Sequence, residues 1–398
     1  MRDLSIYIHV PFCVRKCYYC DFLSFPVSSE KTDLISGSGP EIDKTRNYVN
    51  LLEREIQENS VKYKEYRVIS IFWGGGTPSV LPAKEISRIM EVVRENYRVA
   101  EDAEITIEMN PGTVDACKLQ QYITAGMNRV SIGLQSADDR ELARIGRIHD
   151  YKAFAETYKL ARRAGFDNIN IDIMAALPGQ SVASYEQTLH SVTALEPEHI
   201  SAYSLILEEG TPLYERKSEY HFPSEEEDRE MYMLTKNFLA SCGYHRYEIS
   251  NYAKEGYECR HNKVYWQRGD YAGFGLGASS MVRNVRWKNP EEMQAYKAYA
   301  EQLADKQKDA SVLYIPDRQI LTVQEQMEEY MFLGLRMMCG VNRQEFVRVF
   351  ACRIEDIYGK VIDRLCRQEL LVQDDDCFRL TDRGIDVSNY VMAQFLFD

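Results

Sequence analysis

The sequence lacks the features of a membrane-spanning or exported protein. Its 398 residues contain no apolar run of the roughly 20 residues that a transmembrane helix needs, and no secretory signal precedes the first predicted strand. Peripheral contact with a membrane through a local patch remains compatible with this composition. Ten cysteines without an export signal indicate reduced thiols, so we expect a cytoplasmic protein.

Positive charge is also scarce. The chain has 48 Lys and Arg against 61 Asp and Glu, which gives a formal net charge of −13. A general nucleic-acid binder needs clustered cations to neutralise phosphates, so we expect no nucleic-acid partner. The length allows one large domain, which we assign to residues 1–320, and a small one over residues 321–398.

The most specific stretch is a cysteine motif near the start of the chain. A short apolar strand leads into Cys13, Cys17 and Cys20, with C-x3-C-x2-C spacing. Three thiolates on one loop can converge on one metal centre, and soft sulfur selects zinc, Cu(I) or iron–sulfur over hard cations. An iron–sulfur cube normally takes four cysteines. Three ligands would therefore leave one iron open for a small molecule.

Two alternatives exist for these cysteines. His9 could complete a structural zinc site of the Cys3His kind, although zinc ligands usually come in two pairs and zinc would leave the glycine motif at residues 74–76 without a role. Buried free thiols are the second alternative, but Lys16, Tyr18 and Tyr19 make the stretch too polar for a core strand.

Strands and helices alternate through the middle of the chain. Residues 28–45 are rich in Ser and Gly and predict an exposed loop, followed by a helix to about Lys62. The strand RVISIFW then ends in a glycine turn, residues 74–76, whose bare backbone a ligand can approach. Further helices are predicted over residues 84–96, 115–125, 151–164 and 181–194, each followed by a strand. A strand–helix period of about thirty residues predicts an α/β fold, either a parallel (β/α) barrel or a doubly wound sheet.

Three consecutive strands of this series end with a polar residue: Glu108, Gln135 and Asp172. The carboxyl ends of the strands form the active-site rim of a βα barrel. One such residue would usually be a loop contact, but three in register with the cysteine loop and the glycine turn are better explained by one polar pocket. An acidic pocket beside an open iron suits a zwitterionic, cationic ligand.

Together these motifs resemble a known family. CVRKCYYC, FWGGGTPS, the glutamate of EMNP, the glutamine of GLQS and GRIHD are similar to the radical S-adenosylmethionine (SAM) proteins. The resemblance runs along nearly the whole chain, within the branch that contains oxygen-independent coproporphyrinogen III oxidase and the haem chaperones of the HemW type. It implies a partial TIM-type barrel in which Cys13, Cys17 and Cys20 hold a [4Fe–4S] cluster, and SAM chelates the remaining iron through its amino and carboxylate groups.

The resemblance also implies the rest of a cofactor site. Tyr7 and Tyr19 would flank the cluster and SAM, and a second group would contact or line the SAM site: Gly75, Gly76, Thr77, Glu108, Gln135, Arg147, Asp172 and Ile206. The strand pattern reaches Glu108, Gln135 and Asp172 independently, whereas a charged residue in a context such as that of Arg147 is ordinarily solvated. In such proteins a donor such as flavodoxin or ferredoxin supplies an electron that passes through the cluster to the sulfonium, which splits to methionine and a 5′-deoxyadenosyl radical.

Two features favour the haem chaperones over the oxidase within this branch. The oxidase has a further cysteine two positions after the third, whereas Cys20 is followed by Asp21 and Phe22. The oxidase also has a long N-terminal extension, and this sequence shows only six residues before Tyr7. The resemblance therefore implies a protein that binds haem and transfers it to an acceptor protein, as a monomer or a dimer. The alternative is an enzyme that oxidatively decarboxylates porphyrinogen propionates, and SAM cleavage is compatible with both.

Residues 261–266 match the HNxxYW motif that is associated with haem binding in HemW-type proteins. His261 and Tyr265 would share a face if the segment is helical. An imidazole is a normal axial haem ligand, and Trp266 could offer an apolar ring to the porphyrin. The alternative is a hydrogen-bonded structural histidine beside core aromatics. In the following GFGLGASS, Ser279 stands where the family commonly has histidine.

The βα pattern ends near Leu321. Helices are predicted over residues 324–339, 343–350 and 355–368, before two short strands around Asp374–Asp376, so the C-terminal region predicts a small winged-helix-like domain. Three aspartates at the tip of the wing would repel phosphate, so we expect a module that covers substrate or docks a partner. Four methionines are expected in its core rather than against haem: Met327, Met331, Met337 and Met338.

Overall fold

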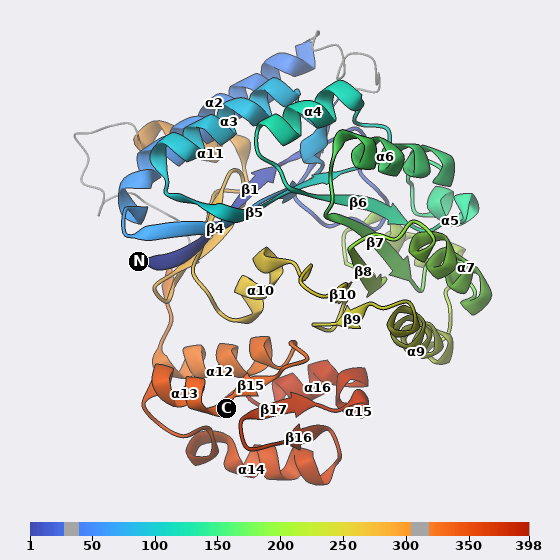
Figure 1. The fold of residues 1–398 in the computed structure, drawn as a ribbon, viewed down its shortest axis with the longest axis vertical. Helices are drawn as coiled ribbons and strands as arrows, with labels where there is room; N and C mark the ends of the chain where they lie inside the picture. Colours follow the sequence, from blue (N-terminus) through green and yellow to red (C-terminus); the bar gives the residue numbers. More distant parts are fainter. Residues whose placement is uncertain (28–39, 304–317, 398) are drawn as a thin grey trace.

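The computed structural model describes residues 1–27, 40–303 and 318–397, and its centre is a twelve-stranded sheet in the order β14-β13-β12-β11-β1-β4-β5-β6-β7-β8-β10-β9 (Figure 1). Seven neighbouring strands run parallel: β11 (Tyr271–Phe274), β1 (Arg2–Val10), β4 (Tyr66–Gly75), β5 (Val99–Met109), β6 (Arg129–Gln135), β7 (Ile169–Ala175) and β8 (His199–Ser204). Antiparallel strands extend both edges: β12 (Ser279–Val282), β13 (Val285–Lys288) and β14 (Gln319–Ile320) on one side, β10 (Asn251–Ala253) and β9 (His245–Arg246) on the other. The two outermost strands do not pair within the described residues, so the predicted partial barrel is confirmed.

Helices cover the outer face of the sheet (Figure 1). They are α2 (Pro40–Asn59), α3 (Ala83–Asn96), α4 (Ala116–Thr124), α5 (Asp139–Arg144), α6 (Tyr151–Ala164), α7 (Val182–Thr193), α9 (Glu225–Ser241) and α11 (Met293–Leu303), with short turns η1 (Ser60–Tyr63), η2 (Pro78–Val80), α8 (Pro212–Glu215) and η3 (Lys217–Glu219). The four helices predicted between residues 84 and 194 are confirmed to within one residue at each end. The loop predicted over residues 28–45 is wrong from residue 40 onward, and its earlier part lies outside the described residues. Pro40 begins α2 because the first position of a helix needs no N–H partner.

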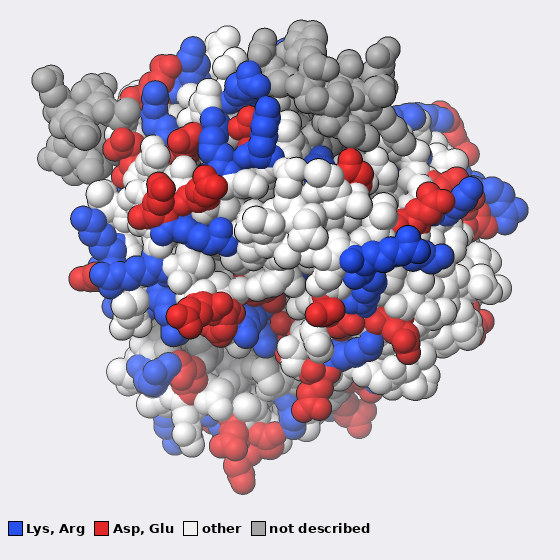
Figure 2. Space-filling view, turned by 45° about the horizontal axis from the view of Figure 1, so that its top comes forward, with Lys and Arg blue, Asp and Glu red and all other residues white. Residues whose placement is uncertain are grey.

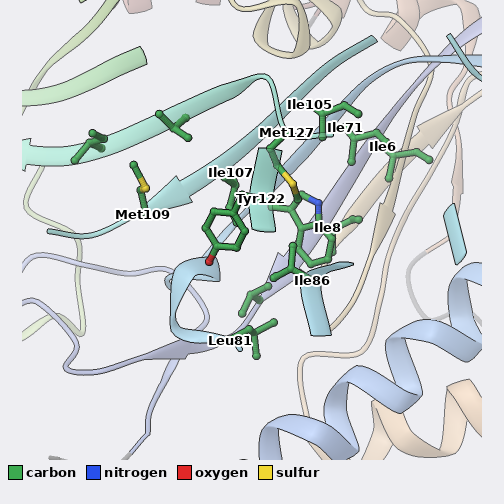
Figure 3. Packing of buried hydrophobic residues seen from close by; sticks show 14 of the residues in the cluster. Ile6, Ile8, Ile71, Leu81, Ile86, Ile105, Ile107, Met109, Tyr122 and Met127 are labelled. Carbon is green, nitrogen blue, oxygen red and sulfur yellow. The ribbon is translucent and has the colours of Figure 1, made fainter. Parts of the chain in front are cut away.

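The core between sheet and helices explains which strand residues face the interior of the barrel. Figure 3 shows Ile6, Ile8, Ile71 and Ile107 packed in one layer with Ile86 of α3, and all five are fully buried. Burying one such side chain contributes about 1.5–3 kcal/mol. Since successive strand residues point to opposite faces, the residues between them point into the barrel.

The C-terminal region forms a smaller unit with its own hydrophobic cluster, which includes Phe346, Leu365, Phe378 and Phe395. Its elements are α12 (Val323–Gly334), β15 (Val341–Asn342), α13 (Arg343–Phe350), α14 (Ile354–Arg367), β16 (Leu371–Gln373), β17 (Cys377–Leu380), α15 (Asp382–Asp386) and α16 (Ser388–Ala393). The strands form an antiparallel sheet in the order β15-β17-β16. The predicted helices and wing are therefore present.

One predicted helix in this unit, residues 324–339, is too long. α12 ends at Gly334, and Met337 instead forms an isolated antiparallel bridge with Glu248. Gly340, with φ of +72°, turns the chain into β15, a conformation that favours glycine. Met337 consequently packs with Tyr247 and Cys259 of the barrel rather than in the core of the small unit, whereas Met327 and Met331 lie in that core and Met338 packs against it.

Residues 261–266, whose conformation the sequence left open, are helical and belong to α10 (Arg260–Trp266). It lies between the barrel and the C-terminal unit (Figure 1). No helix in the described ranges has both the length and the apolar character to cross a bilayer. Figure 2 shows acidic and basic side chains interspersed over one face of the molecule.

Candidate functional site

The cysteine motif forms a loop at the carboxyl end of β1 that is closed at its base. β2 (Phe12–Cys13) and β3 (Phe25–Pro26) pair in parallel, and the N–H of Phe25 donates to the carbonyl oxygen of Pro11 at 2.8 Å. Cys17 and Cys20 lie between these two short strands. The three thiols therefore belong to one closed loop, as their spacing predicted.

The glycine turn lies directly against this loop. The N–H of Gly76 donates to the carbonyl oxygen of Val10 at 2.8 Å, and the N–H of Thr77 to that of Phe12 at 2.7 Å. A Cβ on Gly76 would lie 2.6 Å from the oxygen of Phe12 and 3.0 Å from the Sγ of Cys13. Glycine is therefore required at this position by the close approach of the two backbones.

A cavity of about 430 Å³ opens beside the loop and the turn. All three cysteines line it, together with most of the residues that the sequence predicted for the SAM site: Tyr19, Gly75, Gly76, Thr77, Glu108, Gln135, Arg147, Asp172 and Ile206. Tyr7 is the exception among the predicted residues of this group. It lines an adjoining cavity in the barrel interior instead, where its hydroxyl hydrogen-bonds Nδ1 of His9 at 3.1 Å.

Arg147 connects the cysteine loop to the strand ends. Its Nη2 donates to Oδ1 of Asn110 at 2.9 Å and to the carbonyl oxygen of Gly133, and its Nη1 donates to Sγ of Cys17 at 3.5 Å. Burial opposes its positive charge, but the nearby Tyr19 and Cys17 raise the pKa of Arg147 overall. A permanent cation therefore faces the thiols from the barrel side.

Glu108 is a buried carboxyl group in the same cavity. Burial, with a further contribution from the charge of Asp172, raises the pKa of Glu108 to about 8. Three side chains donate hydrogen bonds to the carboxylate of Asp172: Ser131 at 3.0 Å, Asn170 at 2.7 Å and Tyr203 at 3.0 Å. This pKa favours the protonated form of Glu108 at neutral pH, and a cationic ligand beside it would favour the ionised form.

Gln135 carries two signs of a missing ligand. Its φ is +74°, a left-handed conformation that costs energy for a residue with a Cβ. Its side chain is buried, and Oε1 has no hydrogen-bond partner among the described residues. Strained backbone and an unmet acceptor in a cavity wall fit a site that is completed by a bound molecule.

The zinc alternative finds no support in this geometry. His9 hydrogen-bonds the hydroxyl of Tyr7 through Nδ1, at 3.1 Å, and the carbonyl oxygen of Leu23 through Nε2, at 2.9 Å, so both ring nitrogens are engaged. Among the described residues, no three His, Cys, Asp or Glu side chains converge closely enough to hold a single metal ion. A cube places each thiolate on a different iron and needs no such convergence.

Comparisons with known proteins show the family of this chain. The radical SAM superfamily matches residues 7–192, and the HemN C-terminal domain matches residues 321–387. The heme chaperone HemW of Bacillus subtilis (strain 168) is 34% identical over 395 residues, which cover 98% of this chain and 99% of the relative. The chain belongs to the HemW family of radical SAM proteins.

Two further proteins are similar to this HemW-family chain over almost its whole length. Heme chaperone HemW of Escherichia coli (strain K12) is 32% identical over 405 residues, with 100% of this chain and 99% of the relative covered. Coproporphyrinogen III oxidase (HemN) from Escherichia coli, described as a radical SAM enzyme, has a solved structure that matches with a TM-score of 0.82 at 23% identity, over 99% of this chain and 90% of that chain. The HemW-family chain and the oxidase therefore share one fold.

The HNKVYW segment of this HemW-family chain is buried in α10. His261 is 1% exposed, its Nδ1 hydrogen-bonds Oγ of Ser70 at 2.9 Å, and its Nε2 hydrogen-bonds the hydroxyl of Tyr265 at 2.8 Å. Burial lowers the pKa of His261 to about 3. In this conformation both ring nitrogens are occupied, which is the geometry of the structural-histidine alternative.

Residue patterns missed several groups that line the two cavities. Asn110 follows Glu108 by two residues and comes directly after β5, so the alternation continued by one residue could have found it. Tyr203 and Arg129 gave no comparable signal. Arg129 begins β6 after a turn, where an arginine is ordinarily exposed, yet it is 2% exposed here and lines the barrel cavity.

Proposed function

We propose that this HemW-family protein binds haem and transfers it to an acceptor protein, on a scaffold that carries a [4Fe–4S] cluster and SAM. The observation that carries the cofactor assignment is the single cavity that joins three cysteines of one loop to the glycine turn and the polar strand ends. The assignment of haem as the bound molecule is supported by the full-length similarity to proteins named heme chaperone HemW.

The residues around the cavity suit these cofactors. Cys13, Cys17 and Cys20 would hold three irons and leave the fourth for the amino and carboxylate groups of SAM, with Tyr19 beside them. When bound, SAM supplies a sulfonium that can accept an electron from the cluster. Glu108 and Asp172 offer negative charge to such a cationic ligand.

The remaining predicted residues would enclose SAM. The backbone of Gly75, Gly76 and Thr77 would contact its methionine part, and the free amide oxygen of Gln135 would accept a hydrogen bond. Arg147 would hold the cysteine loop in position through Cys17. Ile206, which is 70% exposed, would be covered by the bound molecule.

For haem, His261 would have to exchange its hydrogen bond to Tyr265 for the iron. Trp266 would contribute an apolar ring only on leaving its contact with Arg336, whose guanidinium carbon lies 4.3 Å from the ring centroid. Tyr7 would remain in the barrel interior beside SAM. Ser279 lines the barrel cavity, so a histidine at this position in relatives would face the same space. The chain would bind haem without it.

We also propose a division after residue 320, a flavodoxin or ferredoxin as the electron donor, and a cytoplasmic location. The division is supported by the separate hydrophobic cluster of the C-terminal unit. The location is supported by ten cysteines that are all free thiols. A monomer and a dimer are both compatible with the proposal.

The test begins with anaerobic reconstitution of the cluster. Wild-type protein is expected to bind about four irons and four sulfides per chain, and Cys17→Ser to lose most of both. Cys242→Ser, at an exposed cysteine outside the cavity, is the matched control. Colourless protein that contains zinc would contradict the proposal.

A second step separates chaperone from enzyme. Haem is added to the reconstituted protein, and its delivery to a haem-free acceptor is followed by absorption. In parallel, SAM, reductant and coproporphyrinogen III are supplied, and protoporphyrinogen and 5′-deoxyadenosine are measured. Haem delivery without protoporphyrinogen supports the proposal, and stoichiometric protoporphyrinogen contradicts it.

A further inference from the structure

Arg129 is a buried charged residue in the barrel. It stands at the start of β6 and is 2% exposed, and its Nε has no hydrogen-bond partner among the described residues. Buried charged groups are normally paired or hydrogen-bonded. An arginine in this state has donors available for a ligand.

Its acidic neighbour does not use those donors. Glu104 accepts hydrogen bonds from the N–H groups of Arg260 at 3.0 Å and His261 at 3.1 Å, so its carboxylate is committed to the start of α10. Burial opposes the positive charge of Arg129, but the neighbouring Cys259 and Glu104 raise its pKa overall. The guanidinium is therefore charged without being consumed by an ion pair.

Arg129 lines the barrel cavity, whose volume is about 750 Å³. Asn262 of the HNKVYW segment lines the same cavity. The cavity also shares Glu108 and Asp172 with the SAM cavity. A residue of the haem-associated motif and two residues of the SAM site therefore line the same cavity.

The lining selects one kind of anion. Asp172 lines this cavity and would repel a doubly charged phosphate more strongly than a single carboxylate, which matches one guanidinium in a bidentate pair. Aromatic residues, among them Tyr7, Phe22 and Phe72, line the same cavity, and their rings suit a large apolar body. The complementary ligand is an apolar ring system that carries carboxylates.

Given the proposed haem-binding function, on which this inference rests, we propose that Arg129 pairs with a propionate carboxylate of haem inside the barrel. Haem would then lie between α10 and the SAM site. The outer surface of α10 would not be the haem site.

The experiment compares haem with haem dimethyl ester, in which both propionates are masked. Full-length protein with a reconstituted cluster is titrated with each, and dissociation constants are obtained from absorption. The variants are Arg129→Met, Arg129→Lys and Arg268→Met. Arg268 is the control because it is a buried arginine outside this cavity, ion-paired with Glu329 at 3.0 Å.

Wild-type protein is expected to bind haem at least about tenfold more tightly than the ester, as expected for a hydrogen-bonded charge pair. Arg129→Met should bind both ligands equally weakly, Arg129→Lys should retain part of the preference, and Arg268→Met should match wild type. Two results would overturn the inference about Arg129 while leaving the proposed function intact. One is equal binding of haem and its ester by wild-type protein, and the other is a preference of Arg129→Met for haem over the ester as large as that of wild type. If Arg129→Met does not fold, Arg129→Lys and the ester comparison still decide. Failure of wild-type protein to bind haem at all would contradict the proposed function itself.

Discussion

Trp266 and Arg336 form a cation–π contact in which the guanidinium carbon lies 4.3 Å from the centroid of the indole ring. The contact joins the end of α10 to the segment that follows α12. Arg336 also lies 3.5 Å from the carboxylate of Glu248, whose side chain is fully buried. In this conformation, the last residue of the HNKVYW segment is therefore a contact between the two units rather than an open aromatic surface.

Arg336→Met should destabilise the protein by about 2–4 kcal/mol, because it removes the cation–π contact and leaves Glu248 without its cation. Urea unfolding measures the loss. The matched control is Arg353→Met, whose side chain is 68% exposed in a surface ion pair and should cost less than about 1 kcal/mol. Equal losses in the two variants would show that the contact between the units contributes nothing.

Glu55 should make the protein less stable as pH rises. It accepts hydrogen bonds from Gly275 at 2.8 Å, Asn289 at 2.6 Å and Tyr296 at 2.7 Å, and burial raises its pKa from 4.5 to about 7. Between these values the folded chain keeps a proton that the unfolded chain has lost. The contribution of Glu55 is therefore full below pH 4.5 and declines by about 3 kcal/mol as pH rises through 7.

The variant Glu55→Gln isolates this effect, because it keeps a hydrogen-bonding side chain of the same size and cannot titrate. Its unfolding free energy, measured in urea at pH 5 and at pH 7.5, should decline less between the two than that of wild-type protein. An identical decline in both proteins would assign the pH dependence to other groups.

Binding of SAM should release a proton from Glu108. The ligand-free carboxyl group has a pKa of about 8, and a cationic ligand beside it favours the ionised form. Calorimetric titration of the reconstituted protein at pH 7, in buffers of different ionisation enthalpy, should therefore report protons released to the buffer. The affinity of wild-type protein for SAM should rise as pH approaches 8. Glu108→Gln should lose both signals, and proton release that persists in this variant would exclude Glu108 as the source.

Gly76→Ala should prevent cluster assembly while leaving the chain folded. The added Cβ would lie 2.6 Å from the carbonyl oxygen of Phe12 and 3.0 Å from Sγ of Cys13, so the cysteine loop must move. Iron content after reconstitution should fall severalfold. Gly359→Ala in α14, where the nearest atom is 3.9 Å from the new Cβ, should retain full iron and gain up to about 1 kcal/mol of stability. Normal iron in Gly76→Ala would mean that the loop adapts to the added methyl group.

Much of the cofactor site could be predicted because its signals are local. The cysteine spacing lies within one loop, and the polar strand ends follow from alternation along β5, β6 and β7. The same reasoning misplaced the start of α2, since Pro40 acts through backbone geometry that hydrophobic spacing does not report. It also misplaced the end of α12, after which Met337 pairs with Glu248, a residue far away in the chain. It also had no means of detecting β11 as a seventh parallel strand, because that pairing joins residues far apart in the chain.

What the sequence determined by itself is the chemistry: three thiols on one loop, a glycine turn, and polar residues at successive strand ends, each defined by near neighbours along the chain. Tertiary structure alone decided which side chains are occupied and which remain available. The HNKVYW motif suggests His261 as a haem ligand, yet both nitrogens of its ring are hydrogen-bonded, to Ser70 and Tyr265. Arg129 resembles a surface residue in the sequence, yet it is enclosed in the barrel with an unpaired donor. The reason is that burial and pairing depend on residues brought together by folding, whereas spacing records only the local chain.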